Sequence, residues 1–285
     1  MGRGRPRGDS GGRVRILRGQ PRRPNGRRRS RALADGGLRI CGGRRPARKT
    51  ADLQAGAPGK RRIRRKNSAR QKSPSAVKIF LATSNAHKAF EFSNMFAAER
   101  LDCQIFCAKD AEGFEPPEEN GSTFAENAFI KADALKRFAP ADAYVMADDS
   151  GLAVDALGGA PGIMSARYAG VEKPGADAAN NAKLLREMES VPDEKRTARF
   201  VCAIALLCPD GLRILSEGKI EGTIGRAERG ANGFGYDPLF YLPERRMTTA
   251  ELAPSDKDAI SHRGTAFAKL AKFLRENRAN LGGIA

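Results

Sequence analysis

Tryptophan is absent from this 285-residue sequence, histidine occurs only twice, and no apolar run is long enough to cross a membrane. A membrane-spanning helix needs about 20 apolar residues, and no apolar segment follows the initial methionine as a signal peptide would require. The cysteines form no C-x-x-C pair, which argues against a zinc site; they are Cys41, Cys103, Cys107, Cys202 and Cys208. We therefore expect a soluble protein of a reducing compartment, with the cytoplasm as the default location.

Two common nucleotide-binding motifs are also missing. No G-x-x-x-x-G-K-[ST] sequence occurs, because GAPGKR at residues 56–61 has the wrong spacing. No G-x-G-x-x-G lies between an expected strand and an expected helix. The P-loop and the Rossmann dinucleotide-binding fold are therefore not predicted.

Acidic residues are scarce in the first 77 positions. Asp9, Asp35 and Asp52 stand there against 25 Lys and Arg residues, whereas the rest of the chain is mildly acidic, although the whole chain has a net charge of +18. The stretch is rich in Gly, Pro and Arg and has no apolar period, which predicts a disordered basic tail over residues 1–76. We expect one domain over residues 77–278 and a short C-terminal tail over 279–285.

The basic tail allows several interpretations. Its charge could bind nucleic acid weakly, or an anionic surface, and Arg-rich N-termini also occur as organelle transit peptides. It could equally be a solvated tail, or result from a start codon assigned upstream of a true start near Val77. We therefore expect little of this charge to matter for the chemistry of the following domain.

Apolar periodicity in the rest of the chain alternates between strand-like and helix-like segments. Short apolar runs at 77–83 and 143–147 predict strands, and two runs around the turn sequence PDG predict a β-hairpin within 198–225. Helical spacing of apolar residues predicts helices within 89–101, 122–139, 177–193 (ended by Pro192) and 265–277. The alternation predicts an α/β fold with a mixed sheet.

Two adjacent carboxylates, Asp148 and Asp149, follow the apolar run AYVMA, where we expect the strand to end. Neighbouring strand residues point to opposite faces, and two carboxylates placed together repel each other unless a cation neutralises them. Magnesium is the expected cation, with Glu118, Glu119 and Glu126 as further oxygen ligands from the upstream loop and helix start. The alternative is a solvated turn of sequence D-D-S-G.

Magnesium commonly serves phosphate chemistry, and several segments could hold phosphates. Ser84 or Asn85 can cap a helix whose first backbone N–H groups, together with Lys88, suit a phosphate. The other basic candidates are Lys131, Lys257 and Arg263. A bare capping loop and solvated surface charges are the alternatives.

A purine base has its own candidate residues. Phe234 and Tyr236, in the Gly-rich sequence GFGYDP, suit stacking on a base, although they would also serve as core aromatics. His262 and Arg263 place two hydrogen-bond donors next to each other, and such donors could read the oxygen of a 6-oxopurine.

Five ordered blocks resemble the signature sequences of the inosine/xanthosine triphosphate pyrophosphatase family. They are TSNAHK (83–88), FAENAFIKA (124–132), ADDSGLAVDALGGAPGIMSARYAG (147–170), GFGYDPLF (233–240) and SDKDAISHRG (255–264). The resemblance runs from about Lys78 to Leu274 and includes nothing of the tail. In the first block the family usually has glycines where this chain has Ser84 and His87, which changes how the backbone can approach a phosphate.

The resemblance implies an elongated α/β structure with a central mixed β-sheet flanked by helices, two lobes around a cleft, and a homodimer. It also implies Mg²⁺-dependent hydrolysis of non-canonical purine nucleoside triphosphates (ITP, dITP and XTP) to the monophosphate and pyrophosphate, with one ion per subunit. Such an activity removes deaminated purines from the nucleotide pool before they enter DNA or RNA.

Matching the blocks position by position implies roles for individual residues. Asp149 resembles the family's proton acceptor and metal ligand, with Asp148 beside it and Glu118 as the other metal-binding acid. The implied substrate-binding residues are Thr83, Ser84, Asn85, Ala86, His87, Lys88, Ser150, Phe234, Gly235, Tyr236, Asp237, Lys257, His262 and Arg263. Two alternatives stay open: a pyrophosphatase for other modified nucleotides, against which the sequence SHRG argues, and a nucleic-acid-binding protein that uses the basic tail.

Overall fold

The computed structural model describes residues 14–18, 77–171 and 174–277, which all belong to one unit formed by Met1–Gly19 and Ala76–Ala285. The second unit, Gln20–Ser75, lies outside the described residues, as does the predicted short tail over 279–285. Most of the predicted basic tail is therefore not described. Within the described ranges, no helix is long and apolar enough to cross a membrane.

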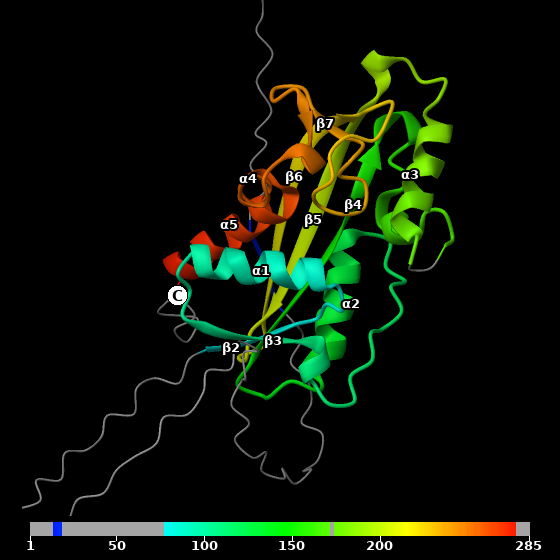
Figure 1. The fold of residues 1–285 in the computed structure, drawn as a ribbon. Helices are drawn as coiled ribbons and strands as arrows, with labels where there is room; N and C mark the ends of the chain where they lie inside the picture. Colours follow the sequence, from blue (N-terminus) through cyan, green and yellow to red (C-terminus); the bar gives the residue numbers. More distant parts are fainter. Residues whose placement is uncertain (1–13, 19–76, 172–173, 278–285) are drawn as a thin grey trace, which may run out of the picture. The chain divides into compact units, whose positions relative to one another are not determined.

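A mixed eight-stranded sheet forms the centre of the fold (Figure 1). The strands are β1 (Arg15–Arg18), β2 (Val77–Leu81), β3 (Cys103–Cys107), β4 (Tyr144–Val154), β5 (Thr197–Leu207), β6 (Leu212–Ile224), β7 (Phe240–Leu242) and β8 (Met247–Thr248). Their order is β3-β2-β4-β5-β6-β7-β8, and β1 pairs with β6 beside this path. β2 runs parallel to β3 and β4, and the other pairs are antiparallel.

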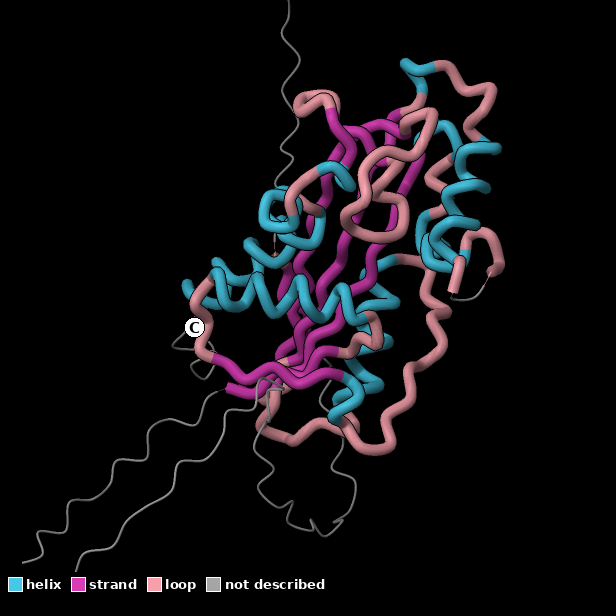
Figure 2. Tube along the Cα trace, viewed as in Figure 1, coloured by secondary structure: helices cyan, strands magenta, loops and turns pink. Residues whose placement is uncertain are grey.

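Helices flank both faces of this sheet (Figure 2). The α-helices are α1 (Ala86–Ala98), α2 (Phe124–Lys136), α3 (Ala176–Glu187), α4 (Pro254–Ile260) and α5 (His262–Glu276). The short 3₁₀ helices are η1 (Ala108–Asp110), η2 (Asp155–Leu157), η3 (Gly162–Arg167), η4 (Asp193–Lys195) and η5 (Thr249–Glu251). A mixed sheet flanked by helices confirms the predicted fold class, and β5 with β6 confirms the predicted hairpin.

Side chains of β4 and β5 alternate between the two faces of the sheet, as the strand period of two requires. Met146 and Ile204 pack in the core that contains α1 and α5, whereas Val145 and Ala203 pack in the core that contains α2. Both faces of the central strands are therefore buried. This explains why residues 200–208 read as a nearly continuous apolar run instead of an alternating one.

A third core joins α3 to the far part of the sheet. Leu184 of α3 belongs to the same buried cluster as Leu152 of β4 and Phe240 of β7. Burying a side chain of this size stabilises a fold by about 1.5–3 kcal/mol relative to leaving it in water. The cluster therefore fixes α3, and the loop that leads into β7, against the strand that carries the two adjacent aspartates.

The strand that carries these aspartates is longer than predicted. β4 does not end at Asp148 but continues through Asp149 to Val154, and it stays paired with β5 along this length. The predicted strand end was wrong because the adjacent carboxylates were taken as the end of the buried run. Lys88 pairs with Asp148 and Lys131 pairs with Asp149, so both carboxylates are neutralised although they lie inside the strand. Because β4 stays paired with β5 here, both side chains project from a rigid backbone.

Residues 15–18 differ from the predicted disordered tail. They form β1, which pairs antiparallel with Leu212–Leu215 of β6, and Val14 packs against the core that contains α5. Ile16 and Leu17 remain 49% and 41% exposed. No strand was predicted here because the short segment lies among arginines without an alternating apolar pattern; β6 supplies the edge on which it pairs.

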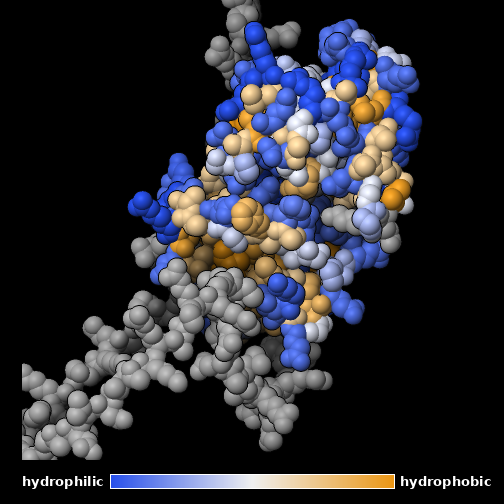
Figure 3. Space-filling model, in the orientation of Figure 1, coloured by the Kyte–Doolittle hydropathy of each residue, from blue (hydrophilic) through white to orange (hydrophobic). Residues whose placement is uncertain are grey.

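The face shown in Figure 3 carries hydrophilic and hydrophobic residues side by side. Exposed large apolar side chains include Phe90 on α1 and Phe138 after α2. Single exposed residues of this kind are normal on protein surfaces and do not identify a partner. The homodimer therefore stays a prediction.

Candidate active site

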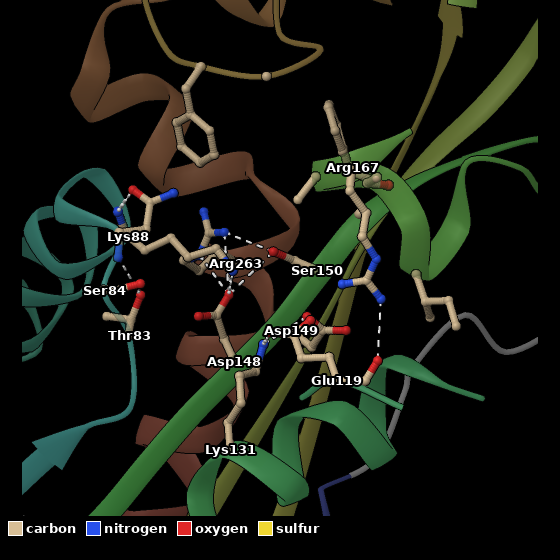
Figure 4. Close-up of a pocket in the computed structure, with 18 of the residues that line it drawn as sticks. Thr83, Ser84, Lys88, Glu119, Lys131, Asp148, Asp149, Ser150, Arg167 and Arg263 are labelled. Atoms are coloured by element: carbon tan, nitrogen blue, oxygen red, sulfur yellow. Dashed lines mark hydrogen bonds and ion pairs between the residues drawn. The ribbon is translucent and has the colours of Figure 1, made fainter. Parts of the chain in front are cut away.

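One cavity of about 300 Å³ gathers residues from all five sequence blocks (Figure 4). The predicted site residues that line it are Thr83, Ser84, Asn85, Lys88, Asp148, Asp149, Ser150, Phe234, Gly235, Tyr236, Asp237, Lys257, His262 and Arg263. Four other residues named from the sequence, Ala86, His87, Glu118 and Glu126, are not among the lining residues, and the Glu126 carboxylate accepts hydrogen bonds from Ser122 instead. Its volume lies at the lower end of the range for small-molecule sites, about 300–1,000 Å³.

The loop between β2 and α1 presents the predicted phosphate-binding segment. Asn85 caps α1, because its Oδ1 accepts hydrogen bonds from the backbone N–H groups of His87 and Lys88, at 3.0 and 3.4 Å. Thr83 Oγ1 accepts a hydrogen bond from the backbone N–H of Asn85 at 3.1 Å. The predicted cap is confirmed for Asn85, and the loop is held by its own polar side chains.

Asp148 is buried and bound to cations on one face of β4. Lys88 Nζ lies 2.8 Å from Asp148 Oδ2, and Nε and Nη2 of Arg263 each lie 3.4 Å from the same oxygen. Ser150 Oγ donates to it as well, at 3.3 Å. Burial alone would raise the pKa of Asp148, but Lys88 and Arg263 outweigh burial and hold this pKa well below its usual value. Asp148 is therefore a fixed anion that holds two cations in place.

Asp149 points to the opposite face of β4, toward α2. Lys131 Nζ donates to Asp149 Oδ1 at 2.9 Å, and Asn127 Nδ2 donates to Oδ2 at 3.4 Å. The same ammonium group of Lys131 lies 3.0 Å from Glu119 Oε1. Burial raises the pKa of Asp149 by more than Lys131 lowers it. Of the two adjacent aspartates, Asp149 is therefore the better proton acceptor.

Phe234 lies among cationic side chains. Lys257 Nζ is 4.8 Å and the guanidinium carbon of Arg263 is 5.8 Å from the centre of the Phe234 ring. The His87 ring, although His87 does not line the cavity, stacks on Phe234 with ring centres 5.7 Å apart. This arrangement suits an aromatic base, with positive charge close by for phosphates.

Helix α3 fixes the loop that carries Phe234. Asp177 Oδ2 accepts a hydrogen bond from Gly235 N at 2.9 Å, and Asn181 Nδ2 donates to Gly235 O at 3.1 Å. Gly235 has φ of 62°, a conformation that favours glycine, and Asp237 Oδ2 accepts from Phe234 N at 2.8 Å. Asp177 and Asn181 were not predicted, because nothing local indicates contact with a loop more than 50 residues further along the chain.

His262 is buried and stacks on Phe200, with ring centres 4.9 Å apart. Burial, reinforced by the charges of Arg263 and Lys257, holds the pKa of His262 well below its usual value. The imidazole is therefore neutral near pH 7, and a neutral imidazole carries one N–H donor and one acceptor.

Glu91 is a site residue that the sequence blocks did not include. Its carboxylate binds Nη1 of Arg263 and lies 3.5 Å from Lys257 Nζ, and Lys257 in turn lies 2.6 Å from Asp237 Oδ2. Glu91 thereby ties α1 to both α4 and α5. Its position three residues after Lys88 places both on one face of α1, a spacing that could have identified it.

The structure brings Glu119, and not Glu118, into the cavity. Glu118 is exposed, whereas Glu119 lines the cavity and contacts Lys131. Sequence reasoning named Glu119 only as a further acid, because the path of the loop decides which of two adjacent glutamates turns inward. The role of Glu118 as a metal ligand stays a prediction.

The chemistry of the cavity's carboxylates fits a magnesium ion. In the part of the chain that the structure describes, no three or more His, Cys, Asp or Glu side chains form a ready-made metal site. Magnesium needs fewer protein ligands, because one or two carboxylates commonly hold it together with water and substrate phosphates. Asp149 and Glu119 offer such a pair, since one oxygen of each already lies within 3.0 Å of the single ammonium of Lys131.

The mixed sheet, and a cavity that combines aspartates with lysines and arginines, define an α/β protein with a strongly charged cavity. The chain belongs to the Ham1 family, whose model matches residues 79–273. This match confirms the resemblance carried by the five sequence blocks. It begins after β1, so β1 and the predicted basic tail lie outside it.

Similar proteins extend over the same part of the chain. A dITP/XTP pyrophosphatase of Geobacillus kaustophilus is 51% identical over 198 residues, which are 70% of this chain and 94% of that protein. A dITP/XTP pyrophosphatase of Leuconostoc mesenteroides is 42% identical over 198 residues, 70% of this chain and 96% of that protein. Among solved structures, a HAM1 protein from Coxiella burnetii has a TM-score of 0.63 at 40% identity, covering 70% of this chain and 99% of that one.

Proposed function

We propose that this protein hydrolyses ITP, dITP and XTP to the monophosphate and pyrophosphate, and so keeps deaminated purines out of DNA and RNA. Two of its relatives are named dITP/XTP pyrophosphatases. The observation that carries the proposal is the placement of two adjacent carboxylates in one cavity lined with lysines and arginines. Lys88 and Arg263 hold Asp148 on one face of β4, and Lys131 and Asn127 hold Asp149 on the other.

Asp149 acts as the general base in this proposal. Its carboxylate would take a proton from the water molecule that attacks the α-phosphate, while Lys131 and Asn127 hold the carboxylate in place. Water is the nucleophile, so no covalent intermediate forms. Asp148 takes no proton, because Lys88 and Arg263 hold its pKa low.

Asp149 and Glu119 are the residues that would hold one magnesium ion per subunit, with Asp148 and Glu118 as the other candidates. A bound magnesium ion would offset phosphate charge and lower the pKa of a water molecule. Lys131 contacts the same two carboxylates, and its ammonium would offset phosphate charge beside them.

The first turn of α1 supplies donors for the phosphates. Asn85 orders the loop, Lys88 brings a positive charge held by Asp148, and the helix N-terminus favours negative charge. Ser150, on the same strand as both aspartates, accepts a hydrogen bond from Arg263 Nη2 at 3.0 Å. The phosphates would thus lie between α1 and β4.

Base recognition is assigned to Phe234, His262 and Arg263. Phe234 would stack on the purine, and the neutral His262 would donate a hydrogen bond to O6 of hypoxanthine or xanthine. Adenine has an amino group at that position and would leave the buried donor unpaired. Sites built around such a hydrogen bond can discriminate by about 10⁴–10⁵-fold.

The quaternary structure and the basic tail enter the proposal separately. We propose a homodimer, which the family resemblance implies. Nucleic-acid binding through the basic tail is the remaining alternative function, and it would appear as DNA affinity that falls steeply with salt.

Product analysis tests this function. The full chain is incubated with ITP and Mg²⁺, and phosphorus NMR follows the products, with an excess of EDTA and the Asp149→Asn variant as controls. We expect equal amounts of inosine monophosphate and pyrophosphate from the wild type, neither product with EDTA, and formation of both products at least about 10²-fold slower with Asp149→Asn. Release of orthophosphate, or undiminished turnover by Asp149→Asn, would refute the proposal.

A further inference from the structure

The cations that line the cavity differ in how they are neutralised. Five lysines and arginines line it: Lys88, Lys131, Arg167, Lys257 and Arg263. Four of them form ion pairs with carboxylates: Lys88 and Arg263 with Asp148, Lys131 with Asp149 and Glu119, and Lys257 with Asp237 and Glu91. Among the described residues, Arg167 forms no such ion pair.

Arg167 has a neutral partner instead. Its Nη2 donates to the backbone carbonyl of Glu119 at 3.3 Å, and the side chain is exposed at the cavity. Figure 4 shows Arg167 across the cavity from Lys88, with its guanidinium directed toward Glu119 on the side of Asp149. Its positive charge is therefore not offset by a carboxylate and lies close to the carboxylates that suit a magnesium ion.

The backbone that carries Arg167 is firmly held. It ends η3, in which Ser165 Oγ donates to Gly162 O at 2.6 Å and accepts from Leu152 N of β4 at 2.9 Å. Asn180 of α3 donates to the carbonyl of Ser165 at 3.2 Å. An exposed, long side chain on a rigid base can turn into the cavity without loss of local structure.

The charges of the cavity explain why such a residue matters. Four of the five cations are already paired with carboxylates, so a nucleoside triphosphate must compete for them or share them. A guanidinium without a carboxylate partner has no such competition, and its planar donors match phosphate oxygens in pairs.

We propose that Arg167 binds the two terminal phosphates of the nucleotide and offsets the charge that develops on pyrophosphate as it leaves. This inference rests on the proposed function, and it adds a substrate-contacting residue that lies across the cavity from Lys88 of α1. The bond that breaks joins the α-phosphorus to the bridging oxygen, which leaves with pyrophosphate, and the attacking water's proton goes to Asp149.

The test separates charge from hydrogen bonding at this position. Arg167→Gln keeps a donor for the Glu119 carbonyl but removes the charge, and Arg167→Lys keeps the charge. Arg226→Gln is the control for loss of an exposed arginine outside the cavity. Arg226 also donates to backbone carbonyls, those of Glu189 and Val191, and in addition pairs with Asp193, but it does not line this cavity. Each full-length variant is assayed for kcat/KM on ITP and for inhibition by pyrophosphate and by inosine monophosphate.

We expect Arg167→Gln to lower kcat/KM by about 10- to 100-fold, the value of one charge-assisted contact, and to weaken inhibition by pyrophosphate to a similar extent. Inhibition by inosine monophosphate should stay within twofold of the wild type, Arg167→Lys should recover part of the loss, and Arg226→Gln should behave as the wild type. Arg167→Gln kinetics within twofold of the wild type, or an equal loss of monophosphate inhibition, would overturn the proposal.

Calorimetry of pyrophosphate binding in Mg²⁺ buffer keeps the inference independent of turnover. A wild type that hydrolyses none of the triphosphates would refute the proposed function, yet weaker pyrophosphate binding by Arg167→Gln than by Arg226→Gln would still support Arg167 as a phosphate contact. Equal pyrophosphate affinity in the wild type and both variants would contradict it.

Discussion

Replacing each of the two adjacent aspartates by asparagine should produce opposite defects. Asp148→Asn removes the only carboxylate that Lys88 contacts among the described residues and one of the two that Arg263 contacts. The side chains of Asp148 and Arg263 are each 1% exposed, so water cannot replace the lost charge. Removing one partner of a buried ion pair costs about 3–5 kcal/mol.

Asp149→Asn should cost much less stability. Lys131 keeps its contact with Glu119, and an asparagine can still accept its hydrogen bond, so we expect a loss of about 1–2 kcal/mol. Its effect on catalysis should be large, because it removes the proton acceptor. We expect turnover of ITP to fall by about 10²–10⁴-fold, the usual contribution of a general base.

Thermal unfolding and steady-state kinetics measured on the same preparations decide between these roles. For a domain of this size each kcal/mol shifts Tm by about 2–4 °C, so Asp148→Asn should melt about 6–20 °C below the wild type. Asp149→Asn should lose its activity while melting closer to the wild type. If Asp148→Asn melts with the wild type, or Asp149→Asn is the less stable of the two, the assignment of roles from burial and charge is refuted.

Two further predictions follow from contacts around the cavity. Asp177→Ala and Asn181→Leu each remove one hydrogen bond to Gly235. Each variant should raise the KM for ITP by about 3- to 10-fold and keep kcat within twofold of the wild type. A fall in kcat at unchanged KM would exclude a role of these residues in positioning the loop. His262 has a folded-state pKa well below its unfolded value of about 6.5, so the unfolded chain binds a proton that the folded chain does not as pH falls. Between pH 7 and pH 5 this should cost about 2 kcal/mol of the free energy of unfolding in urea, and His262→Gln should lose that much less; identical losses would contradict a neutral buried His262.

Local patterns were sufficient for the elements of the fold that carry their own signals. The strand at β2, the helix cap at Asn85 and the hairpin of β5 and β6 each depend on neighbours in sequence, and the structure confirms them. The pair Asp148 and Asp149 also predicts a charged site from the local sequence alone, because two adjacent carboxylates in a buried run need cations nearby.

Features that depend on tertiary contacts were not predicted from the sequence. The continuation of β4 past Asp149 has no local pattern, because it depends on cations that two helices bring to the strand. The pairing of β1 with β6 has none either, because it depends on a free edge of β6. The choice of Glu119 over Glu118 depends on the path of one loop. These features depend on contacts between segments far apart in the sequence, whereas the features that could be predicted depend on residues that are neighbours in the sequence.

The most direct test of the proposed function compares kcat/KM of the full chain for ITP, XTP, ATP and GTP in Mg²⁺ buffer, with release of pyrophosphate as the signal. Recognition of O6 by a neutral His262, with a general base at Asp149, predicts values for ITP and XTP at least about 10²-fold above that for ATP. GTP also carries O6, so its value reports whether position 2 of the base is read as well. Equal values for ITP, XTP and ATP, or no release of pyrophosphate from ITP and XTP, would contradict it.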